Sequence, residues 1–199
     1  MTTRGRGGRT RSRILSAAAA GFAESGYDGT SVAEICRRAQ VSKGAFYHHF
    51  SGKQALFLEL LENWLEMLDR QLEGIGESRK PVPAQLLTMT DLIRDVFGAA
   101  HDQLPVFLEF WTRSTYDPTT WEATIAPYRR YRRFFADIIS SGIDEGSLRP
   151  VDPDTAARVV VSLAIGLVLQ GLLDTEDTDW GTVGRRGMEM LLQGLEKKE

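Results

Sequence analysis

Apolar residues recur at helical spacing along most of the chain. The first clear case is a stripe at intervals of three and four positions, formed by Ile14, Ala17, Ala18, Gly21 and Phe22. This spacing predicts an amphipathic helix that begins near Thr10, and Gly26 is placed to end it. Further helical stretches are predicted over residues 53–72, 84–100, 103–114, 119–143, 153–173 and 180–196. Because no strand pattern appears beside them, we predict an all-α fold.

Polar residues that favour helix starts lie close together between positions 31 and 54. The stretch "SVAE" at 31–34 is a capping box, in which the serine caps and the glutamate reaches back, and it predicts a short helix to about residue 39. Ser42 can cap a second short helix that runs to residue 50. The stretch "SGKQ" at 51–54 repeats the capping box in front of a long helix. Two short helices joined by a tight turn predict a helix-turn-helix.

The second short helix divides into two faces. The apolar face is predicted to pack on the first short helix and contains Val41, Ala45, Phe46 and Phe50. The opposite face exposes Lys43, Gly44, Tyr47 and His48. Exposed aromatic and basic groups next to a glycine fit phosphates and base edges better than they fit a core.

The two adjacent histidines of this helix raise the alternative of a metal site. Neighbouring helical residues point about 100° apart, so His48 and His49 do not share a face. No cysteine or carboxylate at suitable spacing completes a site. We therefore predict no metal site here, and His49 receives no assigned contact.

Charge is distributed unevenly along the 199 residues, whose net charge is −3. Residues 1–53 contain nine Lys and Arg against three acids, a net charge of +6 that leaves −9 on the remainder. A basic segment on an acidic body predicts contact between one end of the molecule and a polyanion. The first nine residues lack apolar periodicity and predict a flexible basic arm, which would either reach a minor groove or only raise the non-specific attraction.

The stretch "TSVAEICRRAQVSKGAFYHHFSGKQALF" (30–57), together with "RSRILSAAAAGFAESGYDGTS" (11–31), resembles the DNA-binding signature of the TetR (tetracycline repressor-like) family of transcriptional regulators. The resemblance implies DNA contacts from Thr30 or Ser31 and from Ser42, Lys43, Gly44, Ala45, Tyr47, His48 and Lys53. Lys43 is the best candidate for a contact with a guanine edge. Two positions depart from the family: Gln40 replaces a common glycine in the turn, and Cys36 replaces a common alanine. A left-handed Gln40 would cost roughly 1 kcal/mol, which is tolerable.

The chain is accordingly predicted to have three parts. Residues 1–9 form the arm, residues 10–53 the helix-turn-helix DNA-binding domain, and residues 54–199 an effector-binding and dimerisation domain. The head is expected to be a three-helix unit on a larger helical body. The helix over 53–72 starts in the head and continues into the body, so it is the predicted hinge.

The last two predicted helices suggest a homodimer. Residues 155–173 are apolar nearly all the way round, with compact residues along one strip at Ala157, Val161, Ala164, Val168 and Gly171. The final helix adds Met188, Leu191, Leu192 and Leu195 at intervals of one, three and four. One face would be buried in the subunit and another in a second copy. The family resemblance implies the same four-helix interface, and a monomer with a wide core is the alternative.

Aromatic residues are concentrated between the head and the last two helices. Binding pockets are mostly apolar and aromatic, and members of the resembled family typically hold a small-molecule inducer here. The predicted lining residues are Trp64, Leu68, Phe97, His101, Phe107, Phe110, Trp111, Tyr128, Tyr131 and Phe135. His101 and Glu109 could orient a polar group of the ligand, although a structural role is the simpler interpretation of each. A solid core is the alternative for the whole set.

No catalytic motif is present in the sequence. It has no glycine-rich phosphate loop, no G-x-S-x-G and no H-E-x-x-H, so we expect no enzymatic activity, no catalytic residue and no cofactor. A single cysteine fits the reducing cytoplasm, and the apolar run 159–173 is short for a membrane span. The predicted function is a cytoplasmic repressor that a largely hydrophobic or aromatic ligand releases from a palindromic operator. The alternatives are a constitutive DNA-binding regulator and a helical protein without a DNA role.

Overall fold

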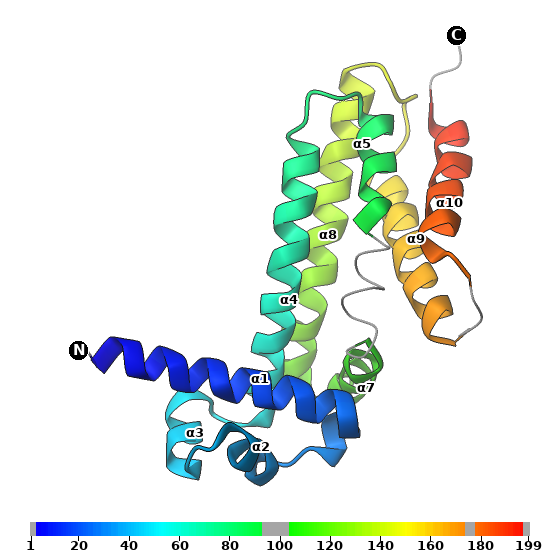
Figure 1. The fold of residues 1–199 in the computed structure, drawn as a ribbon. Coiled ribbons are helices and arrows are strands. Elements are labelled where there is room, and N and C mark those ends of the chain that lie inside the picture. The colour runs from blue at the N-terminus through cyan, green and yellow to red at the C-terminus, as the bar shows by residue number, and fades with distance from the viewer. Residues whose placement is uncertain (1–2, 93–103, 174–177, 197–199) are drawn as a thin grey trace. The chain divides into compact units, whose positions relative to one another are not determined.

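Helices make up nearly all of the part of the chain that the computed structural model describes, which comprises residues 3–92, 104–173 and 178–196 (Figure 1). The helices are α1 (Thr3–Gly29), α2 (Val32–Ala39), α3 (Lys43–His49), α4 (Lys53–Gly76), α5 (Val82–Met89), α7 (Leu104–Ser114), α8 (Pro118–Asp144), α9 (Pro153–Leu173) and α10 (Trp180–Leu195). Within these residues extended pairing is confined to one isolated bridge between Leu148 and Glu196. The predicted all-α fold is confirmed.

The helices form two compact units. The first contains Met1–Glu66 and Asp102–Thr124, and the second contains Met67–His101 and Ile125–Glu199. Helices α4 and α8 each run from one unit into the other. The unit that carries the helix-turn-helix is therefore larger than the predicted 10–53, because it also includes the start of α4 and all of α7.

Aromatic packing explains why α7 belongs to the first unit. Phe110 of α7 is buried, and its ring stacks on that of Phe57 of α4 with 4.1 Å between the centroids. Tyr27, at the end of α1, meets both rings edge-on at 5.1 and 5.4 Å. Leu56 of α4 and Val106 of α7 also belong to this core, and its other buried residues, from α1 to the end of α3, are Ile14, Ala18, Phe22, Ile35, Cys36, Ala39, Phe46 and Phe50. Burial of these large rings ties together segments that are far apart in sequence.

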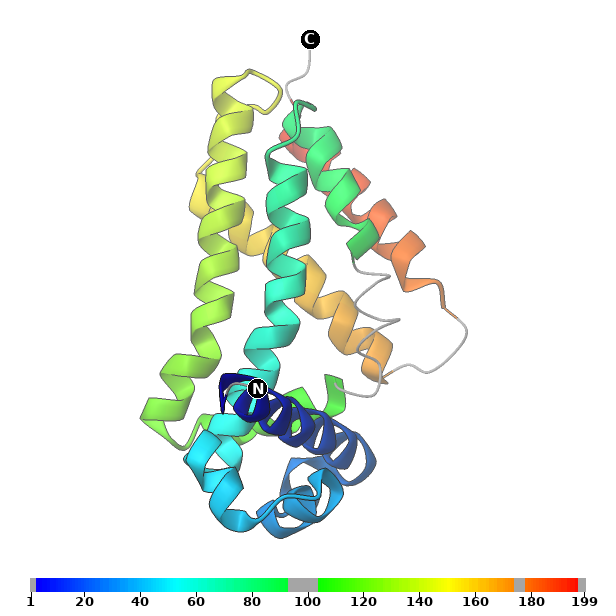
Figure 2. The same cartoon turned by 60° about the vertical axis from the view of Figure 1, so that its left-hand side comes forward.

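The second unit is built around α5, α8, α9 and α10. Its buried core includes Leu86, Ile139, Leu148, Val160 and Leu192, and α5 lies beside α10 (Figures 1 and 2). In the compact strip predicted on α9, Ala157, Val161 and Gly171 are buried and the other two residues are half-buried. This strip is therefore largely the subunit-facing side of α9. Among the described residues α9 is also the one helix whose length and apolar composition would suffice to cross a membrane, a test that core helices pass too.

The first helix begins earlier than the sequence predicts. Residues 3–9, expected to be a flexible arm, are helical in the structure and continue into the rest of α1. Just after this stretch, Arg11 forms an ion pair with Glu59 of α4. Adding residues to an established helix costs less than nucleating one, so the helix extends toward the N-terminus. At the other end the chain leaves helical geometry at Gly26 (φ 72, ψ 173), as predicted.

The capping box predicted at residues 51–54 is wrong. Helix α4 begins at Lys53, and its first turn has the amide of Leu56 donating to the carbonyl of Gly52. The side-chain amide of Gln54 donates instead to Asp117 at 3.4 Å and to Thr120. The Gln54 side chain is thus directed toward acceptors more than sixty residues away in sequence and not back to the start of its own helix.

Candidate DNA-binding site

The two short helices of the head are capped as the sequence predicts. The Ser31 hydroxyl oxygen accepts the amide of Glu34 at 3.1 Å, and that of Ser42 accepts the amide of Ala45 at 3.1 Å. Each bond satisfies an amide that has no partner within its own helix. Both serines are exposed, and each hydroxyl proton remains available to donate to a phosphate.

The turn between them uses a left-handed residue. Gln40 has φ 52 and ψ 48, and its amide donates to the carbonyl of Arg37 at 3.2 Å. The next amide, of Val41, donates to the carbonyl of Cys36 at 3.0 Å. The expected left-handed conformation at Gln40 is therefore confirmed. Arg13, which no local sequence pattern singles out, donates from α1 to the carbonyls of Ala39 and Gln40.

Helix α3 presents the two faces that its sequence predicts. Phe46 and Phe50 are buried, whereas Val41 and Ala45 are half-buried. Tyr47 is 56% exposed. Lys43, Gly44 and His48 are also exposed, and His49 is half-buried. The buried rings anchor α3, so its polar face is held outward on a rigid core.

At Gly44, near the start of α3, no side chain covers the helix backbone. A Cβ added there would meet only the hydroxyl oxygen of Ser42, at 3.8 Å. Packing within the subunit therefore does not require glycine at this position. The space is open to a partner that approaches the backbone closely, as a DNA strand does.

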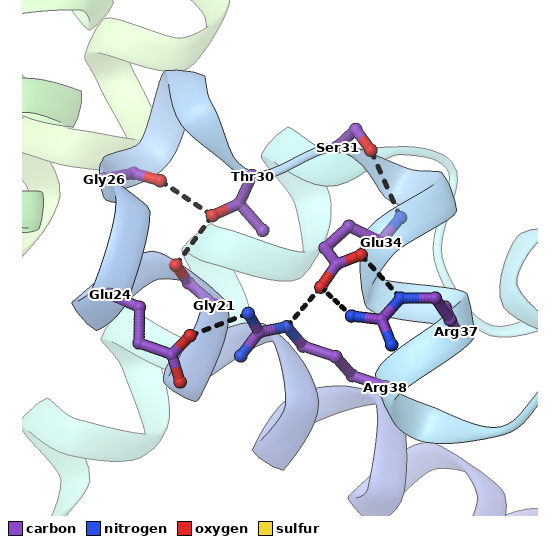
Figure 3. A network of polar contacts seen from close by, with 8 residues as sticks. All are labelled: Gly21, Glu24, Gly26, Thr30, Ser31, Glu34, Arg37 and Arg38. Carbon is purple, nitrogen blue, oxygen red and sulfur yellow. Dashed lines mark hydrogen bonds and ion pairs between the residues drawn. The ribbon is translucent and has the colours of Figure 1, made fainter.

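The Thr30 side chain is buried inside the subunit. It is 1% exposed, and its hydroxyl donates to the carbonyls of Gly21 at 2.8 Å and Gly26 at 2.9 Å (Figure 3). Its methyl carbon lies 2.8 Å from where a Cβ of Gly21 would stand. Burial and these two bonds, at the junction of α1 with α2, account for the Thr30 side chain without a DNA contact, so a contact from Thr30 or Ser31 stays a prediction.

Lys53 joins α4 to the end of α1. Its ammonium donates to the carbonyl of Tyr27 at 2.6 Å and lies 4.3 Å from the centroid of the Tyr27 ring. Burial lowers the pKa of Lys53, although the nearby carboxylate of Asp28 opposes that shift. An ammonium has three donors. A phosphate contact from Lys53 therefore stays a prediction, in addition to the observed bond.

A cluster of charged side chains fixes α2 on α1 (Figure 3). Glu34 accepts from Arg37 at 2.6 and 2.8 Å and from Arg38 at 2.6 Å, and Arg38 also reaches Glu24 at 2.7 Å. Hydrogen bonds from Arg37, and then from Arg38, lower the pKa of Glu34 to about 2. The predicted reach-back of Glu34 to the Ser31 amide is wrong, because these two guanidinium groups hold the carboxylate. The Arg37 side chain is 72% exposed and keeps further donors toward solvent.

The predicted ligand-lining residues fall in two groups. Trp64, Phe107, Phe110 and Trp111 belong to the first unit, and Leu68, Tyr128, Tyr131 and Phe135 belong to the second. Phe97 and His101 lie outside the described residues. Phe110 lies in the core of the first unit, and Phe107 packs against that core. The burial of Phe110 is therefore explained without a ligand. In the second unit, Phe135 is a core residue and the other three pack against that core.

Polar groups accompany the aromatic residues of the second unit. Arg130 donates to the carboxylate of Asp69 at 2.8 Å, and its guanidinium lies 5.5 Å from the centroid of the Tyr131 ring. Burial, and then the carboxylate of Asp69, raise the pKa of Tyr131. A separate cavity of about 290 Å³ in this unit includes none of the ten predicted residues. Its lining residues are Glu73, Gly76, Glu77, Val82, Gln85, Phe134, Asp137, Ile138, Ser141 and Glu145.

A capped helix-turn-helix with a basic, aromatic exposed face defines a DNA-binding protein of the all-helical regulator class. A family model for bacterial regulatory proteins of the tetR family matches residues 14–60. A second, for the C-terminal part of BetI-type transcriptional repressors, matches residues 83–191. The chain therefore belongs to the TetR family of transcriptional regulators.

Individual relatives support this assignment. The HTH-type transcriptional repressor KstR2 of Mycobacterium tuberculosis is 28% identical over 151 residues, which are 75% of each chain. The regulator UidR of Escherichia coli is 24% identical over 194 residues, 94% of this chain and 92% of UidR. The solved structure of KstR2, titled a ketosteroid transcriptional regulator, matches with a TM-score of 0.69 at 25% identity, over 94% of this chain and 95% of that chain. FadR of Bacillus subtilis in complex with stearoyl-CoA shares the fold, with a TM-score of 0.78 at 20% identity over 92% and 97% of the two chains.

Proposed function

We propose that this protein is a homodimeric repressor, acting in the cytoplasm, which a small and largely hydrophobic or aromatic ligand releases from a palindromic operator. One observation carries the DNA-binding part of this proposal. Helix α3 is capped by Ser42, anchored by two buried phenylalanines and exposes Lys43, Tyr47 and His48 on its other side.

The exposed groups suit distinct parts of a DNA duplex. The Lys43 ammonium can donate to the O6 or N7 atom of guanine, which distinguishes base pairs in the major groove. The Tyr47 hydroxyl and a His48 nitrogen can donate to phosphates, which positions the helix without selecting sequence. Gly44 and Ala45 allow close approach of the backbone, and Ser31, Ser42 and Lys53 add donors around it.

Exposed apolar residues on α9 and α10 support dimerisation through these helices. Val159, Ile165, Leu169 and Leu173 are exposed along α9, and Val183 and Met190 are exposed seven positions apart on α10. Leu173 and Met190 are 78% and 73% exposed. These residues are distinct from the buried strip that packs α9 into its own subunit. A second copy that covers them with its own α9 and α10 would form a four-helix interface.

The chemistry of the ligand is inferred from two relatives and from the composition of the second unit. One relative is titled a ketosteroid regulator and another was solved with stearoyl-CoA, so both names point to bulky apolar groups. Leu68, Tyr128, Tyr131 and Phe135 supply apolar and aromatic surface in the second unit. The Asp69–Arg130 pair beside Tyr131 would orient a polar group of such a ligand.

The proposed release is a two-state equilibrium. The two forms differ in the spacing of the two heads, and only one spacing matches the operator. A ligand that binds more tightly to the other form must weaken operator binding by the ratio of its affinities for the two forms. A hundredfold loss of operator affinity needs only about 2.7 kcal/mol of coupling. This is within the ordinary range for allosteric proteins.

Selection of bound duplexes from a random DNA pool by the purified protein tests the proposal. A palindrome with half-sites about 10 base pairs apart, or a multiple of that spacing, is the expected result. Absence of any enriched sequence would contradict sequence-specific binding. A thermal-shift screen with steroids, fatty acyl thioesters and aromatic acids then separates a ligand-controlled repressor from a constitutive one. Failure of every compound to raise the melting temperature would favour the constitutive regulator.

A further inference from the structure

The corner formed by Gly26, Tyr27 and Asp28 is held from outside the helix-turn-helix by Glu109. One carboxylate oxygen of Glu109 accepts the amide of Tyr27 at 2.8 Å, and the other accepts the amide of Asp28 at 2.9 Å. These residues are 82 and 81 positions apart in the sequence. A carboxylate that accepts two consecutive amides forms charge-assisted bonds, which are stronger than neutral ones.

The Glu109 carboxylate also lies close to Gly26. Gly26 has φ 72, and a Cβ built on it would stand 2.8 Å from a carboxylate oxygen of Glu109. Glycine is favoured here by the backbone conformation, and any larger residue would also displace the Glu109 carboxylate from its present position. An exposed ion pair between Arg113, one turn further along α7, and Asp28 adds a second contact at 2.5–2.7 Å.

Tyr27 is held through its amide, its carbonyl and its ring. Its amide is bound by Glu109 of α7, and its carbonyl by Lys53 at the start of α4. Its buried ring packs edge-on against Phe57 and Phe110, from the same two helices. The end of α1 is thus fixed by α4 and α7 together, only a few residues before α2 begins.

We propose that Glu109 is a positioning residue for DNA binding, which holds the corner at residues 26–28 and thereby the orientation from which α2 and α3 meet the duplex. This proposal rests on the proposed operator recognition. The carboxylate acts through the amides of Tyr27 and Asp28 and does not touch DNA itself. Because α7 continues through residues 115–117 into α8, which runs on into the second unit, the corner is connected to the body by a path other than α4.

The test compares Glu109→Gln with Glu73→Gln, which removes the same charge from an exposed position in the second unit. Affinity is measured by fluorescence anisotropy for the duplex that the wild-type protein selects and for a scrambled duplex of equal length. The temperature is kept below the melting transition of every variant. Glu109→Gln is expected to bind the selected duplex at least about tenfold more weakly, with affinity for the scrambled duplex within about twofold of Glu73→Gln. A merely destabilised protein would lose both affinities in the same proportion.

Charge exchange at the second contact provides a rescue. Arg113→Asp is expected to weaken binding to the selected duplex about threefold, since it places a carboxylate beside Asp28 on an exposed surface. The double variant Asp28→Arg/Arg113→Asp restores an ion pair at unchanged net charge and should recover wild-type affinity. Equal affinities of Glu109→Gln and Glu73→Gln for the selected duplex would overturn the positioning role. A wild-type protein that selects no duplex would instead overturn the proposed function on which it rests.

Discussion

The guanidinium of Arg13 donates a hydrogen bond across 3.1 Å to the carbonyl oxygen of Gln40, in the turn between α2 and α3. Gln40 occupies the left-handed region, which costs a residue with a side chain roughly 1 kcal/mol. Arg13 also donates to the neighbouring carbonyl of Ala39. These bonds from α1 offset the strain and explain how the turn forms without glycine.

Gln40→Gly should stabilise the protein, because it removes the left-handed strain and keeps the carbonyl that Arg13 binds. We expect the free energy of unfolding to rise by about 0.5 kcal/mol, since the added flexibility of the unfolded chain cancels part of the gain. Arg13→Ala should lower it by about 1–3 kcal/mol. Urea titration measures both, and a destabilised Gln40→Gly would show that the glutamine side chain contributes something that the structure does not reveal.

Lys43→Ala and Tyr47→Phe should separate base recognition from phosphate contact. Lys43→Ala should cost about 1–3 kcal/mol on the selected duplex and relax the preference at one base pair. Tyr47→Phe removes only the neutral hydroxyl, so binding should weaken similarly on all sequences, while the salt slope, which reports phosphates neutralised by cationic groups, should stay unchanged. Anisotropy titrations at several salt concentrations measure these effects. Unchanged binding in both variants would refute the assignment of α3 as the recognition helix.

Thr30→Val should damage stability and leave recognition intact. The substitution keeps the shape but removes the hydroxyl that donates to Gly21 and Gly26. We expect a loss of about 1–3 kcal/mol in the free energy of unfolding. Operator affinity per folded molecule should stay within about twofold of wild type, whereas loss of a direct phosphate contact would weaken binding to the selected and to a scrambled duplex alike.

The ionised Glu34 should make stability depend on pH in the acid range. Its folded-state pKa of about 2 lies below the ordinary value, so the unfolded chain binds more protons between about pH 5 and 2. The contribution of Glu34 is therefore fully present above pH 5 and is lost as pH falls toward 2. Urea midpoints should fall less steeply over this window for Glu34→Gln than for wild type. Glu73→Gln serves as the control, and an identical slope in both variants would contradict the linkage.

Substitutions on the exposed faces of α9 and α10 should break the proposed dimer. Leu169→Arg and Met190→Arg place a charge among apolar residues that a second copy would cover. Each should yield a monomer in sedimentation equilibrium in detergent-free buffer and lose operator binding. Met67→Arg, at a methionine on α4 that is 51% exposed, is the control and should stay dimeric. Monomeric wild-type protein would refute the interface.

Local patterns predicted the helices and the faces of α3 because helical spacing and serine caps act over a few residues. Gly26 and Gln40 were likewise predictable, since each lies where the chain must leave a helix. The contacts of Glu34, Gln54 and Glu109 were not predictable in the same way. Each of these side chains is bound by groups other than the ones that its local sequence position suggests. The partners of Gln54 and Glu109 lie more than sixty residues away in the sequence. The aromatic composition predicted the lining of a pocket, but spacing along the chain could not reveal that Phe110 stacks on Phe57.

The inclusion of α7 in the first unit limits how this head can be transferred to another protein. A fragment that ends at Glu66 would leave Phe57 and Tyr27 without the ring of Phe110, and two amides without Glu109. Chimeras that exchange only the first sixty residues between relatives would therefore need matching side chains on the recipient's α7. Portability of DNA specificity within the family thus depends on a helix that lies, in sequence, well outside the DNA-binding signature.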